Sequence, residues 1–328
     1  MTQPTKPSLG ELTATARVVA LPLRVKFRGV LEREIMLFEG PNGWCEWSPF
    51  VEYADDEAVV WLRAAIEFGW GNLPEPLVSR VPVNATVPAV APDRALEALA
   101  RFGQFSTVKI KVAEAGQTRA DDIARVVAVQ QAHRDVAIRL DANGALTVAE
   151  AVELATELTE RGVRIDYFEQ PVASVAELAE ARQLLNAIGV RVAADESVRK
   201  ASDPMAVVQA KAADVLVLKA APLGGVAAAA AIANAAGLPW VVSSALESSI
   251  GISMGAHLAA QSTQPLAAGL ATLNLFAGDV CDQPLAPKGG WLEVKRVTPS
   301  AAKLDIFAAE DHRQDWWFER LERCYALL

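Results

Sequence analysis

Short apolar runs alternate with stretches of helical periodicity through the middle of the chain, from about residue 82 to residue 276. Each run is rich in Val, Ile or Leu and ends in polar or charged residues, and the intervening stretches are rich in Ala, Leu and Glu. Apolar strands that alternate with amphipathic helices indicate a parallel sheet buried on both faces. No other feature of the sequence restricts the fold as strongly.

Eight such runs are present, which fits a closed α/β barrel. The runs are Val81–Val90, Thr107–Val112, Val136–Asn143, Ile165–Pro171, Val190–Glu196, Val215–Ala220, Trp240–Leu246 and Ala267–Phe276. The helical patterns are Asp121–Ala132, Thr147–Arg161, Ser174–Ala187, Val226–Ala236 and Ile250–Gln261. The alternative is an open, doubly wound sheet. Such a sheet usually has a Gly-rich turn after its first strand, where this chain has Ala91-Pro92-Asp93.

The two ends of the chain have a different pattern. Val18–Leu23, Glu32–Glu39 and Gly43–Trp47 indicate an antiparallel meander, followed by a helix over Asp55–Phe68. The tail contains a possible hairpin around Gly289-Gly290 and a helical stretch, Asp315–Leu328. We predict that residues 1–80 and 284–328 together form a smaller α+β capping domain, and that residues 81–283 form the barrel.

Composition excludes several classes of function. A net charge of −9 argues against nucleic acid as a partner, because phosphate binding depends on clustered Lys and Arg. No apolar run has the length of a membrane helix, and no signal peptide is visible. Three scattered cysteines suit neither a disulfide framework nor a zinc site. We therefore expect a soluble cytoplasmic protein without a membrane partner, and the sequence gives no indication of its oligomeric state.

Charged residues stand at the ends of five consecutive predicted strands. Positions 111, 141, 169, 195 and 219 are separated by 30, 28, 26 and 24 residues, about one βα unit each. Asp141, Glu169 and Asp195 can therefore converge at the barrel mouth, where three hard oxygen ligands favour Mg²⁺. A single acid at a strand end more often caps the next helix or pairs with a base. Three on consecutive strands make that alternative improbable.

Lysines accompany these carboxylates. Lys109 and Lys111 are two residues apart, so both side chains point to one face of their strand, and Lys219 ends an apolar strand across the barrel. A Lys-x-Lys pair alone is usually a solvated strand face. Mutual repulsion, a nearby metal and partial desolvation should lower a lysine pKa, so that the neutral amine can remove a proton from carbon. Opposed lysines over a metal-bound carboxylate suit proton abstraction α to that carboxylate.

The pattern resembles the lysine-pair branch of the enolase superfamily, in order and in spacing. The matching residues are Lys109-Ile-Lys111, Asp141-Ala-Asn-Gly, Glu169-Gln-Pro, Asp195-Glu-Ser and Lys219. Within that branch the chain is most similar to the o-succinylbenzoate synthase family, on the following stretches: Phe27-Arg-Gly29, Gly43–Tyr53, Ser243–Gly251 and Gly269–Leu273. The resemblance extends from about residue 18 to residue 295.

The resemblance implies a modified TIM-type (β/α)7β barrel, a capping domain and specific roles. Asp141, Glu169 and Asp195 would bind Mg²⁺, which Mn²⁺ can replace. Lys111 would act as the base and Lys219 would stabilise the enediolate. The expected substrate is a small-molecule carboxylate, 2-succinyl-6-hydroxy-2,4-cyclohexadiene-1-carboxylate, which is dehydrated to o-succinylbenzoate in menaquinone biosynthesis. The expected substrate-binding residues are Lys109, Arg139, Asn143, Ser243, Ser244 and Gly269. Phe27–Gly29 and Ser48–Tyr53 would close over the substrate.

Two alternatives remain open at this point. An N-succinylamino acid racemase, or another epimerase or cycloisomerase of the same branch, would use the same two lysines. A barrel that binds a ligand without turnover is the second alternative. It has no use for opposed bases, so the retention of both lysines and all three carboxylates argues against it.

Overall fold

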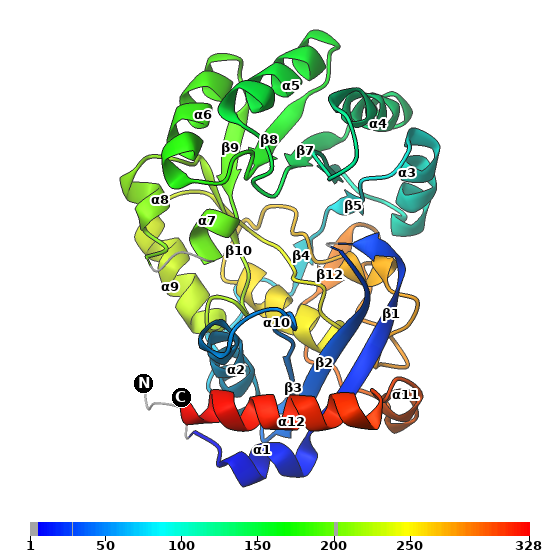
Figure 1. The fold of residues 1–328 in the computed structure, drawn as a ribbon, viewed down its shortest axis with the longest axis vertical. Coiled ribbons are helices and arrows are strands. Elements are labelled where there is room, and N and C mark those ends of the chain that lie inside the picture. Colours follow the sequence, from blue (N-terminus) through cyan, green and yellow to red (C-terminus); the bar gives the residue numbers. More distant parts are fainter. Residues whose placement is uncertain (1–5, 28, 200–202) are drawn as a thin grey trace.

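Seven parallel strands form the barrel sheet in the order β11-β10-β9-β8-β7-β6-β5 in the computed structural model (Figure 1). The model describes residues 6–27, 29–199 and 203–328, with the backbone alone for residues 25–27. The strands are β5 (Ala85–Val87), β6 (Thr107–Lys111), β7 (Ala137–Asp141), β8 (Ile165–Glu169), β9 (Arg191–Ala194), β10 (Val215–Leu218) and β11 (Trp240–Val242). The helices that follow them are α3 (Pro92–Leu99), η1 (Ala100–Phe102), α4 (Arg119–Ala132), α5 (Val148–Glu160), α6 (Val175–Ala187), α7 (Glu196–Arg199), α8 (Ala206–Gln209), α9 (Val226–Ala236) and α10 (Ser249–Ala259).

The eighth position of the barrel is filled by a very short segment. Ala268 forms a parallel bridge with Val83, and Gly269 forms one with Ser243, so the segment joins the two edges of the sheet. The expectation of a full strand over Ala267–Phe276 is therefore wrong beyond Gly269. In the described structure these are the two residues of the run that bridge to the barrel sheet. The chain then turns into a 3-10 helix, η2 (Thr272–Leu275), and Phe276 bridges to Leu23 of β1 instead.

Capping boxes define where three barrel helices begin. In each box the side chain of the residue before the helix accepts a hydrogen bond from the backbone N–H three residues later. The acidic side chain at that later position accepts a hydrogen bond from the backbone N–H of the first residue. The three first residues are Thr118, Thr147 and Ser174. Each box satisfies backbone donors that the first helical turn leaves unpaired. The helices therefore start at fixed positions, which keeps the loops between strand ends and helices short.

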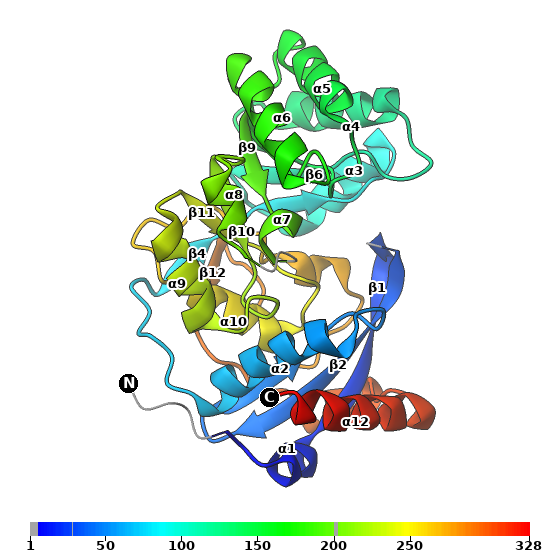
Figure 2. The same ribbon diagram turned by 60° about the vertical axis from the view of Figure 1, so that its left-hand side comes forward.

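The capping domain is built from both ends of the chain (Figure 2). Its antiparallel sheet has the order β1-β2-β3, and helices α2 and α12 pack on it. Its elements are α1 (Leu9–Thr15), β1 (Arg17–Phe27), β2 (Val30–Gly40), β3 (Gly43–Trp47), α2 (Asp55–Trp70), α11 (Ala301–Ile306) and α12 (Asp311–Ala326). The predicted meander and both predicted helices are present, whereas α1 was not predicted. The ring of Trp317 in α12 contacts the ring of Trp47 edge-to-face at 5.3 Å, which joins the two ends of the sequence in one core.

The segment around Gly289-Gly290 differs from the predicted hairpin. Lys288 and Trp291 form a single bridge, and β12 (Trp291–Glu293) pairs instead with β4 (Arg80–Pro82), more than 200 residues earlier in the sequence. Local turn chemistry identified the turn but not the partner of the strand. Within the described part of the chain, every helix is too short or too polar to cross a membrane.

Candidate active site

Three of the predicted residues stand side by side at the ends of neighbouring strands. Lys111 of β6 faces Asp141 of β7 across their ladder, and Asp141 faces Glu169 of β8 in the same way. This register places one lysine and two carboxylates in a single layer at the carboxyl ends of the strands. All three side chains are buried, and each ion therefore needs a charged partner.

Two lysines bind the carboxylates from the β6 side. Nζ of Lys111 donates to Oδ2 of Asp141 at 2.6 Å and to Oδ1 of Asn143 at 2.5 Å. Nζ of Lys109 donates to the two carboxylate oxygens of Glu169 at 2.9 and 3.1 Å, and it lies 3.2 Å from Oδ2 of Asp141. Lys109 therefore places a cation between two carboxylates.

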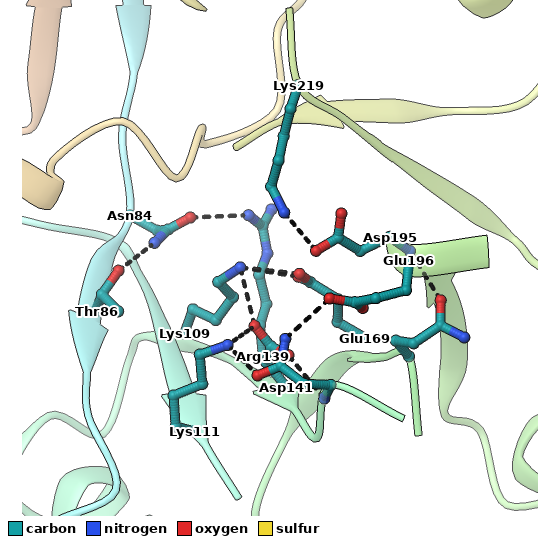
Figure 3. Close-up of polar contacts among 12 residues, drawn as sticks. Asn84, Thr86, Lys109, Lys111, Arg139, Asp141, Glu169, Asp195, Glu196 and Lys219 are labelled. Atoms are coloured by element: carbon teal, nitrogen blue, oxygen red, sulfur yellow. Dashed lines mark hydrogen bonds and ion pairs between the residues drawn. The ribbon is translucent and has the colours of Figure 1, made fainter. Parts of the chain in front are cut away.

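The third lysine reaches the site from the other side (Figure 3). Lys219 follows β10 and donates to Oδ2 of Asp195, while Nε of Arg199 donates to Oδ1 of the same carboxylate at 3.2 Å. Asp195 is thus held by two cations. The arrangement leaves the carboxylates between opposed ammonium groups, as the sequence predicted for a proton-transfer site.

The buried ions shift one another's pKa values in opposite directions. Burial alone would lower the pKa of Lys109, but Glu169 and then Asp141 outweigh it and raise that pKa above its ordinary value. Burial would raise the pKa of Asp141, but Lys111 and Lys109 lower it well below its usual range. Burial raises the pKa of Glu169 to about 7, and repulsion by Asp141 adds to the effect. The expected fall in a lysine pKa therefore does not occur at Lys109 in this structure, because the carboxylates stabilise its charge.

The enclosed space among these groups is small. The part of it that water can enter is about 30 Å³, well below the roughly 300–1,000 Å³ of a typical ligand pocket. Its lining is formed by Thr86, Lys109, Lys111, Asp141, Asn143, Asp195, Lys219, Ser243, Ser244, Ala245, Leu246, Gly269 and Thr272. A larger hollow of about 1030 Å³ lies outside the barrel between α4 and α5. We assign the site to the smaller cavity because it contains the opposed buried ions.

Most of the predicted substrate-binding residues lie at this cavity. Ser243, Ser244 and Gly269 line one side of it, and Gly269 is so close to Ser243 that an added Cβ would lie 2.7 Å from Oγ. Arg139 does not line the cavity. Its guanidinium lies deeper in the barrel, where Nε donates to Asp166 at 2.9 Å and the ion stacks on Tyr167. Of the predicted closing segments, Arg28 lies outside the described residues.

Sequence reasoning missed several residues that contact the site. The amide of Gln170 is fully buried, and its oxygen accepts from the backbone N–H groups of Asp195 and Ser197, both at 3.1 Å. Arg199 lies one helical turn after Asp195. Its position four residues after an acid in a helix is the one signal that could have indicated the pair. Thr86 and Thr272 add hydroxyl groups to the lining, and no local motif marks them.

The donor set fits a hard divalent cation. Asp141, Glu169 and Asp195 offer buried carboxylate oxygens from three adjacent strands, and Lys109 already holds a positive charge between two of them. Among the residues that the structure describes, no three acidic, His or Cys side chains are drawn together as in a formed metal centre. Each of these carboxylates is instead turned to a lysine. A cation would therefore displace ammonium groups rather than enter a ready-made cage.

The barrel, the capping domain and the lysine–carboxylate cluster define an enzyme of the enolase type. Residues 91–299 match the family described as enolase C-terminal domain-like, and residues 18–69 match the enolase N-terminal domain-like family. The chain belongs to the enolase superfamily. This confirms the superfamily and the fold class expected from the sequence.

Several proteins named o-succinylbenzoate synthase resemble the chain over nearly its whole length. The o-succinylbenzoate synthase of Mycobacterium tuberculosis is 50% identical over 326 residues, covering 99% of this chain and 98% of the relative. The o-succinylbenzoate synthase of Mycolicibacterium smegmatis is 48% identical and covers 98% of each chain. Among solved structures, the muconate lactonizing enzyme of Pseudomonas fluorescens complexed with muconolactone matches with a TM-score of 0.75 at 20% identity. It covers 90% of this chain and 98% of that one, and it supports the fold alone.

Proposed function

We propose that this chain is an o-succinylbenzoate synthase. It dehydrates 2-succinyl-6-hydroxy-2,4-cyclohexadiene-1-carboxylate to o-succinylbenzoate and water. The observation that carries the proposal is the pair of opposed lysines, Lys111 and Lys219, on the two sides of a cluster of three buried carboxylates, two of which line the same cavity as the lysines. Relatives that bear this name are about half identical to the chain over almost its full length, and they support the same activity.

Asp141, Glu169 and Asp195 would hold the metal. Enzymes of the superfamily generally use Mg²⁺, and we propose Mg²⁺ here, with Mn²⁺ as a substitute. When bound, the cation supplies positive charge beside the substrate carboxylate and so stabilises the enediolate formed by loss of the α-proton. Occupation of the carboxylates would also displace the ammonium groups of Lys109 and Lys111 from the oxygens that they contact. Metal binding and release of the lysines would therefore be linked.

Lys111 would act as the base and then as the acid. Its amine takes the α-proton and returns it to the hydroxyl group that departs from the same face, because hydroxide leaves poorly unless it is protonated. Lys219 lies on the other side of the carboxylates and would remain a cation beside the developing ring. Because the product gains aromaticity, the dehydration needs no second proton donor on that face.

The current cavity, at about 30 Å³, is too small for the substrate, so substrate binding requires these side chains to move. Ser243, Ser244 and the backbone of Gly269 would then contact the succinyl end of the substrate, and Asn143 would contact the end near Lys111. Arg139 is left out of the proposed contacts because it lies below the cavity. We further infer a cytoplasmic enzyme without a nucleic-acid partner, since its three cysteines are free and buried and its net charge is −9.

The deciding experiment is turnover of the purified cyclohexadiene substrate, compared with N-succinyl amino acids of each hand in D₂O. Dehydration with kcat/KM in the usual enzymatic range of about 10⁴–10⁸ M⁻¹s⁻¹ is the expected result. Racemisation requires both lysines to exchange protons with the substrate. Rapid deuterium exchange and racemisation, with slow or absent dehydration, would replace the synthase by a racemase. Absence of both reactions would leave another epimerase or cycloisomerase of the branch, or a barrel that binds without turnover.

A further inference from the structure

One wall of the cavity contains a residue whose backbone conformation is unfavourable for its side chain. Residues 243–246 follow β11 and line the cavity; we call them the 243–246 wall. Leu246, the last of them, has φ of +63°. A bulky residue rarely adopts this left-handed conformation and keeps it only where its surroundings fix it. The contacts that fix it come from the capping domain.

The first contact is made by Arg33 of β2. This arginine is 2% exposed, and its Nε donates to the carbonyl oxygen of Leu246 at 3.2 Å. Another nitrogen of the same guanidinium donates to the carbonyl oxygen of Ser48, and the ion stacks on the ring of Phe50 at 4.1 Å. A single planar group therefore joins the end of the wall to the segment that follows β3.

The second contact is made by Glu46 of β3. Its Oε2 accepts from the backbone N–H of Ser248 at 3.1 Å, from Oγ of Ser248 at 2.6 Å and from the N–H of Gly251 at 3.0 Å. These groups form the first turn of α10, which starts directly after the wall. A Cβ on Gly251 would lie 2.5 Å from Cβ of Glu247 and 2.9 Å from Cδ of Glu46, so the two side chains together require glycine there. Neither Glu46 nor Arg33 lines the cavity.

We propose that Arg33 and Glu46 are positioning residues for substrate specificity. They hold the 243–246 wall from behind, and through it they set the fit of the non-reacting end of the substrate. The inference rests on the proposed function, because it takes this wall to contact the substrate. It predicts an effect on binding rather than on the proton-transfer step, since the hydrogen bonds of Arg33 and Glu46 described above go to the end of the wall, to the segment after β3 and to the start of α10.

The chain offers a matched control for this proposal. Glu67 of α2 also crosses from the capping domain to cap a barrel helix, with Oε2 accepting from Val226 and Oε1 accepting from Ala227 at 3.0 Å. The loop that it secures, between β10 and α9, lines the cavity only through Lys219 at its start, seven residues before Val226, and it contributes nothing to the 243–246 wall. Replacement of Glu67 should therefore weaken domain docking without moving the wall.

The test compares Glu46→Gln and Arg33→Lys with Glu67→Gln. For the first two we expect KM for the cyclohexadiene substrate to rise by at least about fivefold, with kcat changed less than about threefold. The Kd of the product, o-succinylbenzoate, should rise in parallel by calorimetry with Mg²⁺ present. Glu67→Gln should keep the KM and Kd of the unmodified protein, even if its Tm falls.

Three results would overturn the inference: unchanged KM and Kd in folded Glu46→Gln and Arg33→Lys, a fall in kcat alone, or an equal rise in KM for Glu67→Gln. Arg33→Lys keeps the charge and carries the test if Glu46→Gln does not fold. The failure of the proposed function has a different signature. In that case the unmodified protein would show no dehydration, and its failure to bind o-succinylbenzoate would overturn both proposals.

Discussion

Nζ of Lys111 lies 2.6 Å from Oδ2 of Asp141, the residue that faces it across the β6–β7 ladder. A proposed base and a proposed metal ligand thus form one buried ion pair. Replacing Lys111 by Ala should lower kcat by at least the 10²–10⁴-fold that is typical of general acid–base catalysis. Initial rates of o-succinylbenzoate formation measure this, with Lys288→Ala, an exposed lysine outside the cavity, as the control. A loss of less than tenfold would exclude Lys111 as the base.

Metal dependence can be tested at Glu169. EDTA should abolish dehydration, and Mg²⁺ or Mn²⁺ should restore it. Glu169→Gln should weaken Mg²⁺ binding by at least about tenfold in calorimetry, because it removes one of three hard anionic ligands. Full activity of the metal-free protein would contradict the proposed site.

The buried Glu46 predicts a pH dependence of stability. Burial raises the pKa of Glu46 from 4.5 to about 7, and repulsion by the charge of Glu247 is the second largest cause of the rise. Between these values the folded state holds a proton that the unfolded state has released, so the contribution of Glu46 to stability falls as the pH rises. The free energy of unfolding, measured relative to Glu46→Gln, should fall by on the order of 3 kcal/mol between pH 4.5 and pH 7. Denaturant titrations of both proteins at several pH values measure this difference in the free energy of unfolding. If the difference stays constant or rises with pH, the carboxylate of Glu46 is charged already at low pH.

Adding a single methyl group at Gly225 should lower the stability of the fold substantially. Its φ is +126°, and an added Cβ would lie 2.1 Å from Oε2 of Glu67. Gly225→Ala should lower the free energy of unfolding by at least about 2 kcal/mol, from backbone strain and from the displaced carboxylate. Gly237→Ala is the control, because its φ is also positive but its Cβ would meet no atom within 4 Å. Calorimetric unfolding compares the two, and an equal loss at both positions would show that the Glu67 contact adds nothing.

The barrel and the charged strand ends could be predicted because they depend on local pattern. Apolar runs identify the strands, and nearly constant βα spacing brings Asp141, Glu169 and Asp195 to one edge. Depth along the barrel axis was harder to predict. Arg139 shares its side of the strand with Asp141, yet it is two residues earlier, which places its guanidinium below the cavity. Alternation along a strand specifies the face but does not specify the layer.

Contacts between the two domains could not be predicted at all. Arg33 and Leu246 are 213 residues apart, and Glu46 and Ser248 are 202 apart. Neither pair carries a local signal, because the partner atoms are backbone groups that any residue provides. The pairing of β12 with β4 was missed for the same reason.

The joining of the two ends of the sequence in one capping domain has a consequence for synthesis on the ribosome. Arg320 of α12 donates to the carbonyl oxygen of Phe50, 270 residues earlier, and also to that of Tyr53. Tyr53 in turn accepts from Arg199, which holds Asp195. While β1–β3 and α2 wait for α12, the barrel strands β5 to β11 can already assemble their sheet. The capping domain is therefore among the last parts of the nascent protein to reach its final form.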